Sequence, residues 1–310
     1  MPLLNARHAR SIATGALAAA GTLAAASCAM ARPAMSRVGV APVGLGADTA
    51  TFASASGSTI HAWFSVGGRG RGAVLLLHGV GADRRVMLDR ARFLHAEGYA
   101  VLIPDFQAHG ESPGKHITFG ALESLDAAAA LAYLRARSPG ERVGVIGVSM
   151  GGAAALVGPP GPLSADAFVL ESVYPTIRDA TRDRLRSWFG PFGPPFTSPL
   201  IRLVSGQIGI TADSLRPIER IGRLTAPVLV AAGTRDHYTT IAESRALYAR
   251  ATSPKEFWPV EGAGHVDLHE FAPADYERRV NAFFDRWLRG PDARVATALP
   301  NEAAAPPATR

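Results

Sequence analysis

The stretch Gly147-Val148-Ser149-Met150-Gly151 places one serine between two glycines, directly after the apolar run Arg142-Val143-Gly144-Val145-Ile146. This spacing is typical of a sharp turn from a strand into a helix, which exposes a strained serine hydroxyl at the edge of a sheet. Side chains at the two glycine positions would collide with the neighbouring strand and helix backbone. We therefore expect Ser149 to be a nucleophile held on such a turn.

Segments with strand-like and helix-like patterns alternate on both sides of this turn. We expect strands at residues 59–66, 73–77, 99–104, 142–148, 166–170, 227–231 and 255–260. We expect helices at residues 84–97, 119–137, 241–251 and 273–289. Such alternation predicts an α/β fold, with a mostly parallel central sheet flanked by helices.

The alternation stops between residues 174 and 223, which we interpret as a helical lid inserted over the sheet. We expect the aromatic side chains of this segment to line an apolar entrance. They are Trp188, Phe189, Phe192 and Phe196. The alternative, ordinary packing of a small helical cap, remains open.

Composition favours one globular domain that binds no nucleic acid. The chain has 310 residues, of which 47% are hydrophobic, enough for a sizeable core. Its formal net charge of +6 comes almost entirely from arginines that are dispersed among acidic residues. No long basic run is present, so we expect a solvated arginine-rich surface and no nucleic-acid partner.

The N-terminus has the pattern of a secretory signal peptide, which we assign to residues 1–31. Arg7, His8 and Arg10 precede an uncharged apolar stretch at residues 11–26. The single cysteine, Cys28, ends a sequence that resembles a bacterial lipidation site, although Ala25 stands where leucine is favoured. Lipidation of Cys28 and simple cleavage after Ala31 both remain open. We expect an exported protein, either periplasmic or attached to a membrane as a lipoprotein through Cys28.

The remaining boundaries follow from composition. Residues 32–50 are rich in Gly, Ala and Pro without periodicity, which predicts a linker. Residues 51–290 are expected to form the domain. Residues 291–310 form an Ala- and Pro-rich stretch that predicts a disordered tail.

A nucleophilic serine needs an imidazole to take its proton and a carboxylate to orient that imidazole. His265 follows the last expected strand, in a loop of small residues, and is the favoured imidazole; His269 is the competing candidate and is expected to face solvent. Asp236 follows the strand at 227–231 and is the favoured acid. Glu171 follows the strand after the serine and is the alternative acid.

The oxyanion of an ester intermediate needs two backbone N–H donors. We expect one from Met150, the residue after the serine, and one from Val80, which lies between two glycines. His78 is expected to support this loop by hydrogen bonding. Asp105 and His109 are expected to form a structural turn at the mouth of the site.

Several short motifs have the order and spacing of the α/β-hydrolase superfamily, which the chain resembles. They are His78-Gly79, Pro104-Asp105, His109-Gly110-Glu111-Ser112, the serine turn, Gly233 with Asp236, and Gly264-His265. The similarity covers residues 51–289 and is strongest to the serine-aminopeptidase-like and lysophospholipase-like branch, whose members carry a lid. The resemblance implies a hydrolase without metal or cofactor, acting on small-molecule esters.

We therefore expect a serine hydrolase that cleaves hydrophobic carboxylic esters through an acyl-enzyme. Two alternatives remain: a serine peptidase of the aminopeptidase type, and a non-catalytic envelope binding protein on the same fold. The peptidase would need an anionic pocket for a substrate amine.

Overall fold

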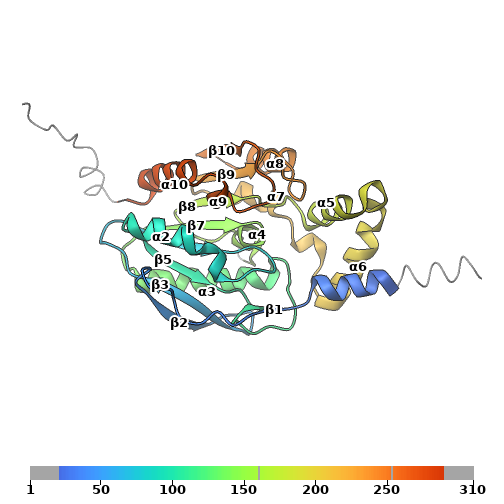
Figure 1. Cartoon of the computed structure of the whole chain (residues 1–310), viewed down its shortest axis with the longest axis horizontal. Coiled ribbons are helices and arrows are strands. Elements are labelled where there is room, and N and C mark those ends of the chain that lie inside the picture. The colour runs from blue at the N-terminus through green and yellow to red at the C-terminus, as the bar shows by residue number, and fades with distance from the viewer. Residues whose placement is uncertain (1–20, 160, 253, 290–310) are drawn as a thin grey trace, which may run out of the picture.

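The computed structural model describes residues 21–159, 161–252 and 254–289. Within them, eight strands form one sheet in the order β10-β9-β8-β7-β4-β5-β3-β2 (Figure 1). All neighbours are parallel except at one edge, where β3 runs antiparallel to both β2 and β5. The strands are β2 (Ala47–Ala53), β3 (Thr59–Ser65), β4 (Ala73–Leu77), β5 (Ala100–Pro104), β7 (Val143–Val148), β8 (Ala167–Glu171), β9 (Val228–Gly233) and β10 (Lys255–Val260).

Helices cover both faces of this sheet, so the predicted α/β architecture is confirmed. Along β4, Leu75 and Leu77 face one core, whereas Val74 and Leu76 face the other. The first core contains α3 (Ala121–Arg137), α4 (Met150–Val157) and α8 (Ile241–Arg250). The second contains α2 (Leu88–Ala96) and α10 (Pro273–Trp287). Continuous apolar strands form here because a parallel sheet is buried on both sides.

The chain leaves β4 toward one face and leaves β7 toward the other. The 3-10 turn η1 (Arg84–Met87) and α2 follow β4 on the second core, whereas α4 follows β7 on the first. The segments that follow the adjacent strands β4 and β7 therefore leave the sheet toward opposite faces. In open α/β sheets, this divergence creates the crevice where ligands bind.

A helical extension lies between β8 and β9, where the sequence predicts an insertion, and protrudes beyond the sheet (Figure 1). We call α5 (Ile177–Phe189), α6 (Thr197–Ile208) and the turns between them, η2 (Gly190–Phe192) and η3 (Pro194–Phe196), the cap. Thr176 begins α5 by accepting a hydrogen bond from the N–H of Asp179. The chain returns to the sheet through η4 (Ala212–Ser214), α7 (Pro217–Arg220) and η5 (Ile221–Arg223).

The segment predicted as a linker, residues 32–50, is instead part of the folded domain. Ala34–Met35 forms β1, which pairs in parallel with β6 (His109–Gly110), and β2 already begins at Ala47. We call residues 31–39 the strap. Its backbone bonds to loops distant in sequence, a pairing that leaves no periodic pattern, so composition alone suggests a linker.

The ends of the chain are only partly described. Residues 21–30, within the predicted signal peptide, are helical, and Leu23, Ala26 and Met30 pack against the first core. Residues 1–20 and the predicted tail at 291–310 lie outside the described residues. Among the residues that are described, no helix combines the length and the apolar character needed to cross a bilayer.

Candidate active site

Ser149 lies on a sharp turn between β7 and α4, at the sheet edge where the parallel strands end. Its backbone has a φ of 49°, a conformation that costs a non-glycine residue about 1–3 kcal/mol. A Cβ at Gly147 would lie 2.5 Å from Cα of Gly152, and one at Gly151 would lie 2.3 Å from the carbonyl oxygen of Leu77. These neighbours are backbone atoms, so only glycine allows β4, β7 and α4 to approach this closely.

His265 and Asp236 follow the neighbouring strands β10 and β9, and their side chains meet. Nδ1 of His265 lies 2.7 Å from Oδ2 of Asp236. Oδ1 of Asp236 accepts from the N–H groups of Tyr238 and Thr239 at 2.8 and 2.9 Å. Burial tends to raise the pKa of Asp236, but the hydrogen bond and charge of His265 and these N–H groups hold that pKa below its usual value. Because an ionised carboxylate only accepts, Nδ1 carries the imidazole proton and Nε2 is left as an acceptor.

The alternative acid, Glu171, has other partners. Its carboxylate is buried at the end of β8 and lies 2.7 Å from the guanidinium of Arg90. It also accepts a hydrogen bond from the hydroxyl of Tyr276. Arg90 pairs further with Asp267, at 2.7 Å. Glu171 thus serves a buried ion pair, and the carboxylate bonded to His265 is that of Asp236.

The competing imidazole, His269, lies away from this pair, and the expectation that it faces solvent is wrong. Its side chain is 9% exposed, and Nε2 lies 2.9 Å from a carboxylate oxygen of Glu277. The ring packs against Phe93 and Tyr276. The short helix α9 (Leu268–Phe271) turns His269 toward α10, and a packing contact of this kind has no signature in sequence.

Two buried histidines support the loop that contains Val80. His78 accepts a hydrogen bond from the N–H of Phe106 through Nε2, so its Nδ1 donates to the carbonyl oxygen of Gly79. Nε2 of His109 accepts from the N–H of Gly81 at 3.1 Å. Burial lowers the pKa of His78 to about 3, with help from the neighbouring His109, so His78 remains neutral. The bonds fix the backbone on both sides of Val80.

The two expected oxyanion donors face no competing acceptor. Met150 is the first residue of α4, so its N–H has no acceptor within the helix. Among the described residues, the N–H of Val80 donates to no protein atom either.

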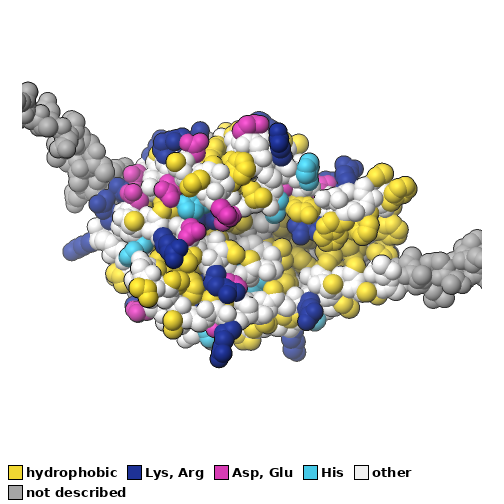
Figure 2. Space-filling model, viewed as in Figure 1, with side chains coloured by type: hydrophobic (Ala, Val, Ile, Leu, Met, Phe, Trp, Pro, Cys, Tyr) yellow, Lys and Arg dark blue, Asp and Glu magenta, His cyan; other side chains and the backbone are white. Residues whose placement is uncertain are grey.

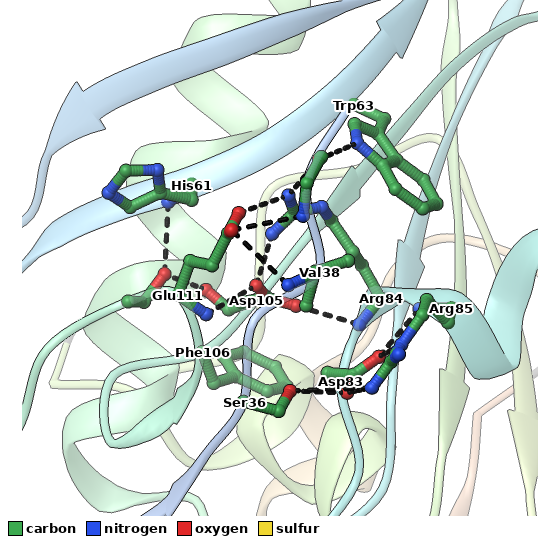
Figure 3. A network of polar contacts seen from close by, with 12 residues as sticks. Ser36, Val38, His61, Trp63, Asp83, Arg84, Arg85, Asp105, Phe106 and Glu111 are labelled. Atoms are coloured by element: carbon green, nitrogen blue, oxygen red, sulfur yellow. Dashed lines mark hydrogen bonds and ion pairs between the residues drawn. The ribbon is translucent and has the colours of Figure 1, made fainter. Parts of the chain in front are cut away.

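Figure 3 shows a network of polar contacts around Arg84, which follows this loop in the chain. The buried guanidinium of Arg84 pairs with Asp105 and lies 2.6 Å from a carboxylate oxygen of Glu111. It also donates to the carbonyl oxygen of Gly39 at 2.9 Å and lies 4.8 Å from the ring centroid of Trp63. The network joins the strap to the turn that carries His109. Asp105 therefore has the structural role that the sequence predicts.

Ser149 and His265, far apart in sequence, line one hollow at the carboxyl edge of the sheet, which we call the serine chamber. Val80 and Met150 also line it, as do Ile177, Ala180 and Thr181 of α5. The structure thus gathers four of the five predicted site residues around one space, with Asp236 bonded to His265 from behind.

The cap aromatics differ from the prediction that they line the entrance. Trp188 and Phe189 are 53% and 59% exposed, and Phe192 and Phe196 are 78% and 42% exposed. None of them borders the serine chamber. Hydrophobic side chains gather at this end of the molecule, around the cap and residues 21–30 (Figure 2). The α5 residues that border the serine chamber are instead Ile177, Ala180, Thr181 and Arg184.

Met30, Arg184 and Tyr238 are among the residues that border the chamber and that the sequence did not predict as site residues. Arg184 lies 4.3 Å from the ring centroid of Tyr238, and that ring packs edge-on against His265. No carboxylate in the described chain pairs with Arg184. The helical spacing of positions 177, 181 and 184 is a signal that could have identified Arg184. Met30 has no such signal, because it falls within the predicted signal peptide.

Comparison with known proteins identifies the family. The model of the "Alpha/beta hydrolase family" matches residues 74–279, about two thirds of the chain. The chain belongs to the alpha/beta hydrolase family. The match spans the loop at Val80, the serine turn, Asp236 and His265, so all of the predicted site lies within it.

Relatives and solved structures agree with this membership. The alpha/beta hydrolase is 32% identical over 216 residues to the uncharacterized protein Rv2307c of Mycobacterium tuberculosis, covering 68% of this chain and 69% of the relative. It is 25% identical to the uncharacterized protein YqkD of Bacillus subtilis, covering 68% and 70%. The structure of the Pyrococcus furiosus esterase Pf2001 superposes with a TM-score of 0.67 at 26% identity, covering 84% of this chain and 98% of the esterase.

Proposed function

We propose that this alpha/beta hydrolase cleaves carboxylic esters, with Ser149 as nucleophile, His265 as general base and Asp236 as the carboxylate that orients it. The observation that carries the proposal is the bond between His265 and Asp236 beside a strained serine in one hollow. Similarity to an esterase structure at 26% identity supports the ester as substrate class.

The proposed reaction is acyl transfer in two halves. Oγ of Ser149 attacks the ester carbonyl carbon while Nε2 of His265 takes the hydroxyl proton. The N–H groups of Val80 and Met150 stabilise the oxyanion, and each contributes on the order of 10²–10³ in rate. The imidazolium then protonates the departing alcohol. Water attacks the acyl-enzyme, His265 takes its proton, and the acid leaves as Ser149 recovers its hydrogen.

The charges around the serine chamber favour an ester over the amine-bearing substrate of an aminopeptidase. Such a peptidase needs a carboxylate to bind the substrate ammonium group. Among the described residues, no Asp or Glu borders the serine chamber, and the charged side chain there is Arg184, which would repel an ammonium group. Ser149 and His265 also border a neighbouring hollow that contains Asp267, but the carboxylate of Asp267 is already paired with Arg90. The peptidase alternative is therefore the weaker one.

Replacing the serine tests the proposal. We expect Ser149→Ala to lower kcat toward p-nitrophenyl esters by on the order of 10⁶-fold, with the melting temperature nearly unchanged. Ser172→Ala is a matched control, because Ser172 has a φ of 48° and its buried hydroxyl bonds to no atom of the described residues. It should retain activity.

A fluorophosphonate probe separates the alternatives. It should label the wild type and the Ser172→Ala variant but leave Ser149→Ala unlabelled. A folded wild type that neither reacts with the probe nor hydrolyses any ester would favour the non-catalytic binding protein. Turnover of amides without turnover of esters would favour the peptidase.

We further propose that the chain is exported, that the cap acts as a lid over the site, and that lipid on Cys28 holds the protein at a membrane. Cys28 is exposed, and residues 21–30 lie at the same end of the molecule as the cap (Figure 1). The exposed cap aromatics suit contact with a bilayer. Mass measurement of the mature N-terminus is the test: a lipidated chain beginning at Cys28 is expected, and an unmodified chain beginning at Arg32 would contradict membrane attachment.

A further inference from the structure

A second hollow adjoins the serine chamber, between α5 and α6, and we call it the cap chamber. Met30, Phe119, Ile177 and Thr181 border both chambers. The remaining wall is largely aliphatic, supplied by side chains of α6 such as those of Leu200, Ile201, Val204 and Ile208. Among the residues that the structure describes, no charged side chain borders the cap chamber. Its chemistry suits a hydrocarbon chain that enters from Ser149.

Met30 is held at this junction by the strap that follows it. Ala31 is fully buried, and its carbonyl oxygen accepts from the N–H of Ile117 at 3.0 Å. The N–H of Ala34 donates to the carbonyl oxygen of Ala108 at 2.8 Å, within the pairing of β1 with β6. These bonds lie on the C-terminal side of Met30. They therefore hold the backbone directly after Met30 whether or not the residues before Cys28 are retained.

We propose that Met30 is a wall residue of the substrate site and sets how long an acyl chain the enzyme accepts. This inference rests on the proposed esterase function. A short acyl group fits within the serine chamber, whereas a longer unbranched chain passes Met30 into the cap chamber. The flexible thioether of methionine suits a residue that a hydrocarbon chain displaces. Met30, which lies within the predicted signal peptide, is thus also part of the proposed substrate site.

The role of Met30 requires that the signal peptide is cleaved before Met30. Cleavage before Cys28 leaves Met30 and the strap in the mature chain, whereas cleavage after Ala31 removes Met30 and opens both chambers on one side. A mature exported chain beginning at Cys28 supports the inference. A mature chain beginning at Arg32 overturns it.

The direct test compares kcat/KM for p-nitrophenyl esters from two to sixteen carbons, using full-length Met30→Trp and Met30→Ala variants. Met30→Trp should lower kcat/KM for the long esters by about tenfold or more and leave that for the acetate within about twofold. Met30→Ala should leave kcat/KM for the long esters unchanged or raise it. Met35→Trp is the matched control, because Met35 lies on the same strap, is 49% exposed and borders neither chamber. Its chain-length profile should equal that of the wild type.

A second variant guards against misfolding. Ile201→Trp narrows the cap chamber from the opposite wall and should reproduce the loss of long esters. Folded Met30→Trp and Ile201→Trp proteins with unchanged chain-length profiles would overturn the inference. A wild type without ester hydrolysis dependent on Ser149 would instead refute the proposed function.

Discussion

Asp236 and Glu171 are both buried carboxylates at the carboxyl edge of the sheet, where Asp236 follows β9 and Glu171 ends β8, yet they have different partners. Asp236 is bonded to His265, which borders the serine chamber, whereas Glu171 is bonded to Arg90 in the second core. The first bond can orient an imidazole, and the second neutralises a buried guanidinium. Substitutions at the two positions should therefore affect different properties.

We expect Asp236→Asn to lower kcat by about 10³–10⁴-fold, because an amide can present its N–H to the imidazole and favour the wrong tautomer. Glu171→Gln should instead destabilise the fold by on the order of 3 kcal/mol, because Arg90 loses a buried charged partner. Ester hydrolysis and urea unfolding of both variants measure these effects. If a folded Glu171→Gln protein lost ester hydrolysis while Asp236→Asn kept it, the assignment of Asp236 as the catalytic acid would be wrong.

Because the pKa of Asp236 is lowered, its contribution to the stability of the fold depends on pH. A carboxylate whose pKa is lower in the folded state stabilises the fold above its unfolded value of about 4 and loses this contribution as pH falls through the lowered folded value. The wild-type advantage in unfolding free energy over Asp236→Asn should therefore shrink at acid pH. An advantage that grows at acid pH would contradict the direction of the shift.

At the scale of elements, α4 is the helix most tightly constrained by its neighbours. All eight of its residues are buried, and its first turn lies against β4 and β7. The cap helix α6, by contrast, buries only Thr197, Leu200 and Val204. Replacing a glycine by alanine should therefore destabilise the fold in α4 and stabilise it in α6.

We expect Gly151→Ala to destabilise the protein by about 1–3 kcal/mol and to lower activity, because the new methyl group would displace β4 or the serine turn. Gly206→Ala in α6 meets no atom within 4 Å. It should stabilise the fold by about 0.5–1 kcal/mol through helix propensity. Denaturant midpoints of both variants measure this contrast. Equal midpoints would show that close backbone approach does not explain Gly151.

At the scale of the whole molecule, the strap connects the cap end to the body of the domain. It bonds to the turns that carry His109 and Arg84, and Met30, the residue directly before it, borders both chambers. The network in Figure 3 therefore joins the strap to Arg84, which follows the loop of Val80 in the chain. An exported chain that keeps this segment would place its N-terminus beside its substrate site.

The sequence by itself determined seven of the eight strands of the sheet, the helices on its faces and the turn at Ser149, but it missed β2, which begins within the segment predicted as a linker. The strands predicted at 73–77 and 255–260 have the observed bounds. Periodicity and glycine spacing suffice here because local sterics and burial on both faces of a parallel sheet act on adjacent residues.

Only the tertiary structure decided which carboxylate meets His265, where His269 points, and that residues 31–39 belong to the fold. The first and the third depend on partners far away in sequence, Arg90 for Glu171 and the turn at His109 for the strap. The second depends on how α9 packs against α10, which places His269 beside Glu277. A short segment that is bonded through its backbone to a distant loop leaves no periodic pattern of side chains. For this reason Met30 could be recognised at the substrate site only after the chain was folded.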